Sequence, residues 1–287
     1  AGTLGAMIPP SVLMIVFGIV METSITQLFI AGLIPGLLSG FMFIACITIS
    51  VLLKPGAAPA DRTRYSLKEK LRILGDVWPL PVLVIAIIGG IFAGVFSATE
   101  AGAIGALVAT VIAMARRALT WEIFLRSLRE TAATTASLFF ILVGASLFAR
   151  FMALSTLPTA MAEAGSHIFT SPVQIVVAIA VAFIVLGMFL ESISIMLLTL
   201  PILSPILAGA DVNLIWFGIL TVKLLEIGLV TPPIGMNIFV IHGALAGQVP
   251  LGEIFRGVFR FIVADIITLA LLIAFPAIVL WLPAHMG

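Results

Sequence analysis

Charged residues are scarce in this sequence: 14 Lys and Arg and 13 Asp and Glu make up only 9% of its 287 residues. A soluble domain usually carries about 25% charged residues. Because 62% of the residues are hydrophobic, a water-soluble fold would have to hide almost the whole chain, which the surface of a protein of this size does not permit. The sequence therefore predicts an integral membrane protein in a lipid bilayer. Its net charge of +1 gives no indication of a nucleic-acid partner.

Cysteine and histidine are almost absent as well. The single Cys46 excludes an internal disulfide framework, shows no metal-ligand spacing, and is expected to be a small core residue. The three His are scattered, and the sequence has no HExxH motif, GxSxG motif or pair of intramembrane Asp residues. We therefore predict that the protein is not an enzyme and has no catalytic residues.

Long uncharged runs dominate the sequence instead. A membrane span needs roughly 20 apolar residues, and these runs lack the alternation of barrel strands, so we expect helices. The candidates are Thr23–Leu53, Val77–Thr99, Ala101–Ala115, Thr131–Ala149, Ile168–Leu190, Ser192–Ala210, Ile227–Gly252 and Ile266–Gly287.

Basic residues predict the orientation of these spans. Twelve of the 14 Lys and Arg lie in three segments, 54–72, 116–129 and 256–260, which should therefore be cytoplasmic. Amphipathic helices are expected on that membrane surface at 66–76 and 121–130. The last helix, from about Ile254, then ends on the outer side of the membrane.

Two proline pairs interrupt the apolar sequence. The stretch GAMIPPSVLMIVFGIV begins at Gly5, and GLVTPPIGMNIFVIHG covers Gly228–Gly243. A proline removes a backbone donor and forces an extended residue before it, so each pair should unwind roughly one turn. The freed carbonyls suit a hard cation such as Na⁺, and the N–H groups of the following half-helix suit a carboxylate. The two breaks lie in helices of opposite expected direction, which favours an inverted repeat over kinks used only for packing.

The candidate site residues follow from these breaks. We expect Na⁺ to be bound mostly by backbone carbonyls, at Gly5, Ile8, Gly228, Val230 and Thr231. Ser11 and Asn237, beside the prolines, are candidates for substrate binding, with helix capping as the equal alternative for Asn237.

A polar tip joins two apolar halves within about 170–210. It carries Glu191, Ser192 and Ser194. This tip favours a re-entrant hairpin over two full spans, because a tip at membrane depth must line a cavity. A carboxylate there should face water, a cation or a donor, so these three residues are further candidates for substrate binding. The alternative is a tip that merely reaches the outer interface.

A few other polar residues have two interpretations each. Lys223 and Glu226 are spaced as an ion pair, which we prefer to a functional role. Arg150 either extends to the interface or attracts substrate. Glu100 is expected to cap a helix beside Thr99, and His242 to be packed rather than to relay protons.

Several stretches together resemble the large membrane subunit of tripartite ATP-independent periplasmic (TRAP) transporters. GMFLESISIMLLTLPILSPILAG from Gly187 is followed by LLEIGLVTPPIGMNIFVIHG from Leu224. GGIFAGVFSATEAGAIGA from Gly89 and GTLGAMIPPS from Gly2 resemble the same family, in the family's order. The resemblance covers essentially the whole chain, although each stretch alone would be unspecific.

The resemblance implies an elevator-type secondary transporter in a bacterial inner membrane. It implies Na⁺ coupling and a small carboxylate substrate, such as a C4-dicarboxylate, a keto acid or a sialic acid. It also implies two partners, a small membrane subunit and a periplasmic substrate-binding protein. Members of the family carry a first hairpin before the motif at Gly5, so we expect this chain to be a fragment or one piece of a split subunit. A stand-alone Na⁺-coupled dicarboxylate symporter and a structural membrane subunit without its own site are the alternatives.

The expected fold is an all-α integral membrane protein, with the plan of a multi-span inverted-repeat elevator-type transporter. Residues 1–53 would end the first repeat, and 54–77 would form a cytoplasmic loop with an arm helix. Residues 78–130 would hold scaffold spans and a second arm helix. Residues 131–287 would form the second repeat, with a re-entrant hairpin (about 170–210), a broken helix (about 213–246) and the last span.

Overall fold

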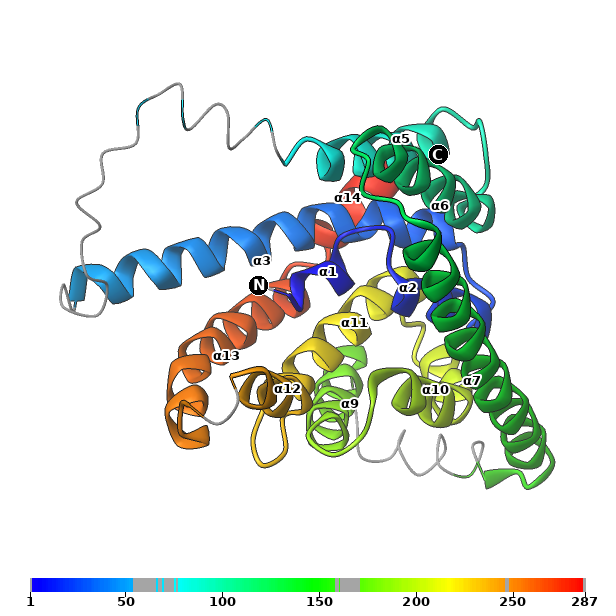
Figure 1. Ribbon diagram of the computed structural model, residues 1–287. Helices are drawn as coiled ribbons and strands as arrows, with labels where there is room; N and C mark the ends of the chain where they lie inside the picture. Colours follow the sequence, from blue (N-terminus) through cyan, green and yellow to red (C-terminus); the bar gives the residue numbers. More distant parts are fainter. Residues whose placement is uncertain are drawn as a thin grey trace. The chain divides into compact units, whose positions relative to one another are not determined.

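All regular structure in the described part of the chain is α-helical. The computed structural model describes residues 2–53, 66, 69, 75, 77–157, 160, 171–245 and 248–285. The helices (Figure 1) are α1 Leu4–Met7, α2 Val12–Val20, α3 Ile25–Leu53, α5 Pro79–Phe92, α6 Ala98–Ala115, α7 Trp121–Leu154, α9 Pro172–Gly187, α10 Ser192–Gly209, α11 Leu214–Val230, α12 Met236–Ala244, α13 Leu251–Ala274 and α14 Ala277–Ala284. Of these, α3, α7, α10 and α13 are long and apolar enough to cross a membrane. The all-helical prediction is confirmed for the described residues.

The chain forms two compact units. One contains residues 1–48 and 140–287, and the other contains residues 49–139. In the second unit α5 packs on α6, and a Cβ on Gly105 would lie 2.9 Å from Ile87 Cδ1. Glu100 is an N-terminal capping residue of α6, as expected, and its partner is Ser97: the Ser97 N–H donates to Glu100 Oε2 over 2.8 Å, and the Glu100 N–H donates to Ser97 Oγ.

The segment 121–130 is helical, but it is not a separate arm helix. It forms the first part of α7, which continues to Leu154 without interruption. The reason is local: residues 126–135 contain neither Pro nor Gly, and Arg126 pairs with Glu130 one turn later, at 2.8 Å. The domain boundary expected at 130 therefore has no counterpart in the helix. The other expected arm helix, 66–76, lies outside the described residues apart from Ser66, Glu69 and Gly75.

Helix α11 is the centre of the first unit, where α9, α13 and α2 pack against it (Figure 1). It is buried from Ile215 to Gly228, and a helix that is apolar on all sides is typical of this position. The side chain of Asn213 caps its first turn by accepting from the backbone N–H groups of Ile215 and Trp216, at 3.0 and 3.1 Å. The Trp216 Nε1–H donates to the carbonyl of Leu272 over 2.9 Å and so ties α11 to α13.

The last apolar run is not one helix. α13 ends at Ala274, and α14 begins at Ala277 after Pro276. The helix expected from about Ile254 is present as α13, but the uncharged run that begins at Ile266 is divided between α13 and α14. Pro276 has no backbone N–H to donate to Leu272, and it forces the residue before it out of helical geometry, so the helix stops there. The freed carbonyl of Leu272 is the acceptor that Trp216 uses.

Both proline pairs break their helices, as predicted. α1 ends at Met7 and α11 ends at Val230, in each case two residues before the first proline. Ile8 and Thr231 then take extended conformations, with ψ of 123° and 134°, which is the geometry that a following proline demands. The peptide bonds Pro9–Pro10 and Pro232–Pro233 are both cis. Helices resume at Val12 and Met236.

Candidate functional site

The second break leaves backbone oxygens without their helical donors. Pro232 and Pro233 stand four residues after Gly228 and Leu229, whose carbonyls therefore lack an N–H partner in the helix. The Thr231 N–H donates instead to the Gly228 carbonyl over 3.1 Å, and the Thr231 hydroxyl donates to the Ile227 carbonyl over 2.6 Å. Within the described part of the chain, no such bond reaches the carbonyls of Leu229 and Val230. Among the carbonyls predicted for Na⁺ at this break, Gly228 thus accepts one hydrogen bond, whereas Val230 accepts none of those between described residues.

The first break also leaves backbone carbonyls without helical donors. Pro9 and Pro10 stand four residues after Gly5 and Ala6, so these two carbonyls have no helical donor. Ser11 is buried and caps α2 by accepting from the Met14 N–H over 3.4 Å, which gives it a structural role beside the expected substrate role. The break lies against α3, because a Cβ on Gly32 would be 2.9 Å from the carbonyl oxygen of Met7.

The hairpin meets the second break through two glycines. Gly187 ends α9, and Gly228 lies in the last turn of α11. A Cβ on Gly228 would be 2.6 Å from Gly187 Cα, and one on Gly187 would be 2.8 Å from Gly228 Cα. Only glycine permits two backbones to approach this closely. The structure thus brings the helix–turn–helix expected at 170–210 against the break expected at 228–233, although the two are about 40 residues apart.

The polar tip forms the start of α10. Both oxygens of Glu191 cap this helix by accepting from the N–H groups of Ile193 and Ser194, at 3.0 and 3.1 Å. The Ser194 hydroxyl also donates to Glu191 Oε2 over 3.3 Å. Ser192 is buried, and its hydroxyl has no hydrogen-bond partner among the described residues. The tip is therefore well organised, with Glu191 exposed at its surface.

A cavity of about 520 Å³ lies beside the second break. It is lined by Gly2, Thr3, Phe43, Val230, Asn237, Val240, Ile241, Val258, Phe261 and Asp265. Two residues predicted for the site, Val230 and Asn237, thus share one cavity. Gly5, Ile8, Ser11 and the hairpin tip do not line it. Its oxygen and amide groups are of the kind that bind a hard cation or a carboxylate.

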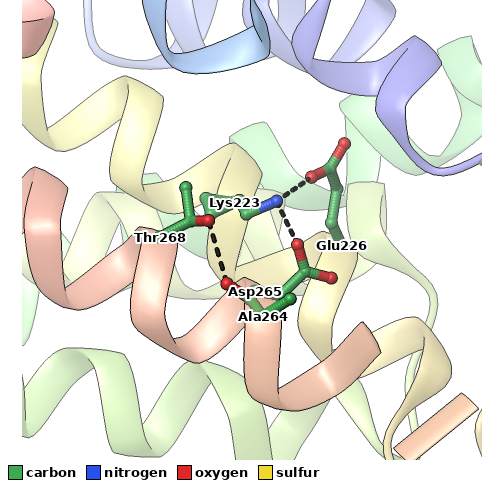
Figure 2. A network of polar contacts seen from close by, with 5 residues as sticks. All are labelled: Lys223, Glu226, Ala264, Asp265 and Thr268. Atoms are coloured by element: carbon green, nitrogen blue, oxygen red, sulfur yellow. Dashed lines mark hydrogen bonds and ion pairs between the residues drawn. The ribbon is translucent and has the colours of Figure 1, made fainter. Parts of the chain in front are cut away.

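A buried ion cluster adjoins this cavity. The Lys223 Nζ contacts Glu226 Oε2 at 3.1 Å and Asp265 Oδ1 at 2.5 Å, and all three side chains are at most 4% exposed (Figure 2). The predicted Lys223–Glu226 ion pair is confirmed. Asp265, which joins the cluster to the cavity wall, was missed. The signal was available: Asp265 is the only acidic residue after Glu253, and a lone acid in a span needs a partner.

His242 and Cys46 each contact a backbone carbonyl, and Arg150 lies at the surface. His242 Nδ1 lies 3.0 Å from the Val249 carbonyl, in agreement with the expected packing role. Cys46 is half-buried in α3, and its thiol donates to the Arg260 carbonyl over 3.6 Å. Arg150 is exposed near the end of α7. None of these three lines the cavity beside the second break.

Comparison with known proteins gives consistent matches. A family model described as "Tripartite ATP-independent periplasmic transporter, DctM component" matches residues 1–278. The C4-dicarboxylate TRAP transporter large permease protein of Pseudomonas aeruginosa is 35% identical over 289 residues, covering 100% of this chain and 66% of that protein. The sialic acid large permease protein of Vibrio cholerae is 33% identical, covering 98% and 65%. The ectoine large permease protein of Halomonas elongata is 33% identical, covering 96% and 64%. The chain thus spans about two thirds of the length of these relatives.

Proposed function

The chain belongs to the DctM component family of TRAP transporters, and from this membership we propose that it forms part of a permease for Na⁺-coupled uptake of small carboxylates. The permease would lie in a bacterial inner membrane with the C-terminus of the chain on the periplasmic side. It would work with a small membrane subunit and a periplasmic substrate-binding protein. C4-dicarboxylates, keto acids and sialic acids are the proposed substrate classes; the names of two relatives support the first and the last.

The observation that carries this proposal is the pair of helix breaks. At each break, prolines leave backbone carbonyls without hydrogen-bond donors. Val230 and Asn237 both line the cavity beside the second break. The donor set consists of hard oxygen atoms and fits Na⁺. When bound, Na⁺ would supply positive charge to attract a carboxylate. Asn237, in the first turn of α12, would donate to that carboxylate together with the N–H groups of the helix start.

The hairpin and the two units support the finer mechanism. α9 and α10 have 16 and 18 residues, which corresponds to roughly 24 and 27 Å at 1.5 Å per residue. α9 falls short of the hydrocarbon core of about 30 Å, which favours a re-entrant hairpin, whereas α10 is at the lower limit of length for a span. Both breaks and the hairpin belong to one compact unit, whereas α5 and α6 belong to the other. An elevator-type mechanism needs this division, because the site must travel as one body.

Reconstitution tests the proposed function directly. The complete permease that contains this chain is placed in proteoliposomes with its small subunit, and uptake of a labelled C4-dicarboxylate, keto acid and sialic acid is measured. We expect uptake of at least one class that requires both an inward Na⁺ gradient and the binding protein. Uptake without the binding protein would indicate a stand-alone symporter. Absence of uptake together with absence of Na⁺ binding would indicate a structural subunit.

Substitution of Glu191 separates its capping role from a role in transport. Asn is as good a helix cap as an acidic residue, so Glu191→Asn should leave the midpoint of thermal unfolding unchanged. Because Glu191 presents its charge at the hairpin tip, we expect Na⁺-driven uptake by this variant to fall at least tenfold. Glu191→Ala, which loses the bonds to Ile193 and Ser194, should lower both quantities. Full uptake by the Asn variant would show that Glu191 acts only as a cap.

A further inference from the structure

The buried ion cluster contains more negative than positive charge. Lys223 is the only cation in it, and it is shared by the two carboxylates of Glu226 and Asp265. Lys223 is 0% exposed, Glu226 2% and Asp265 3%. A buried charge without compensation is costly, because little solvent screens it. A surplus of one negative charge in this position therefore calls for a cation close by.

The surplus belongs to Glu226. Asp265 has the shorter contact with the Lys223 ammonium, 2.5 Å against 3.1 Å for Glu226. Glu226 Oε1 has no hydrogen-bond partner among the described residues. In Figure 2 this oxygen points away from both Lys223 and Asp265. The charges of Lys223 and Asp265 thus neutralise each other. Glu226 keeps one oxygen bonded to Lys223, Oε2, and one oxygen without a partner, Oε1.

Glu226 lies between the two proline breaks. It stands two residues before Gly228 and one helical turn before Val230, so its side chain and that of Val230 lie on one face of α11. On the other side, α1 ends at Met7, two residues before the first proline pair. α1 packs directly on α11. No other described acid stands within a helical turn of either break along the chain.

Carbonyl groups alone give a cation dipoles but no countercharge. The carbonyls freed at Gly5 and Val230 carry no net charge, and a monovalent cation bound there would remain uncompensated in a low-dielectric interior. We propose that Glu226 supplies the fixed negative charge for Na⁺ bound at the proline breaks. Lys223 and Asp265 are then positioning residues that hold Glu226 Oε2 and leave Oε1 free. This inference rests on the Na⁺ coupling of the proposed function.

Thermal unfolding in the presence of Na⁺ tests the assignment without relying on transport. The purified complete permease is titrated with NaCl at constant ionic strength, with KCl as the balancing salt, and the midpoint of unfolding is recorded. The wild type should be stabilised by Na⁺ and not by K⁺, because a ligand that binds only the folded state raises its stability. In Glu226→Gln, which keeps the shape and neutralises the surplus, the half-saturating Na⁺ concentration should rise at least tenfold.

Two further variants make the result decisive. Asp265→Asn also removes one negative charge, so Lys223 then neutralises Glu226, and the same tenfold rise is expected. If Glu226→Gln does not fold, Asp265→Asn provides the same test. Glu130→Gln is the matched control, because its carboxylate is 65% exposed in the pair with Arg126, and it should leave the Na⁺ response unchanged.

The outcomes separate the two proposals. A wild-type protein that shows no Na⁺-specific stabilisation contradicts the Na⁺ coupling of the proposed function. A wild type that responds to Na⁺, with Glu226→Gln or Asp265→Asn responding at the same concentration, overturns only the role of Glu226.

Discussion

Gly228→Ala should lower the stability of the permease by about 1–3 kcal/mol and abolish Na⁺-driven uptake. The added methyl group would lie 2.6 Å from Gly187 Cα and 3.0 Å from its carbonyl carbon. Both are backbone atoms, which cannot rotate away as a flexible side chain can, so α9 and α11 must separate. Separation would displace the hairpin from the second break, where the proposed Na⁺ and substrate sites meet. The measurements are the midpoint of thermal unfolding and uptake in proteoliposomes.

The control for this prediction is a glycine in open space. Gly257 lies inside α13, and a Cβ there would meet no atom within 4 Å. Gly257→Ala should therefore be neutral or stabilise the protein by up to about 1 kcal/mol, because alanine favours the helix more than glycine does. Gly187→Ala should behave like Gly228→Ala, since the contact is reciprocal. If Gly228→Ala behaves like Gly257→Ala instead, the close contact between hairpin and break does not control the site.

The breaks could be predicted from the sequence because their cause is local. Proline removes a specific hydrogen bond and restricts the residue before it, so the ends of α1 and α11 follow from the positions of Pro9 and Pro232. The helix bounds expected at about 213–246 agree with α11 and α12 for the same reason. The expected arm helix at 121–130 did not end where the polar segment ends, because a change in polarity alone does not stop a helix.

The candidate site was only partly predictable, because its remaining features depend on which helices meet. The Lys223–Glu226 pair is local and was expected, but the partner of Lys223 on α13 depends on the register of α11 against α13. The contact of Gly187 with Gly228 likewise needs the packing of α9 on α11. Composition shows that a lone acid such as Asp265 needs a partner, but not which one. The cavity that joins Val230, Asn237 and Asp265 exists only once these helices are placed.

Lys223→Met should destabilise the permease by about 3–5 kcal/mol, because removal of one partner of a buried ion pair leaves uncompensated charge. In this variant two carboxylates, Glu226 and Asp265, would remain in the interior without the ammonium that contacts both. Met is similar to Lys in length and in its apolar stem, so the substitution largely conserves the side-chain volume. The loss of stability therefore measures the effect of removing the positive charge. The midpoint of thermal unfolding of the purified permease is the measurement.

A second substitution shows whether charge is the cause. Adding Asp265→Asn to Lys223→Met removes one of the stranded carboxylates and should recover part of the lost stability, whereas a packing defect would persist. Arg126→Met is the control for an exposed pair: Arg126 and Glu130 are 79% and 65% exposed, and exposed pairs contribute little because water screens them. A loss for Lys223→Met no larger than that for Arg126→Met would mean that the cluster does not hold α11 to α13. In that case Glu226 would not be fixed between the two breaks, and its proposed charge contribution to both of them would lose its structural basis.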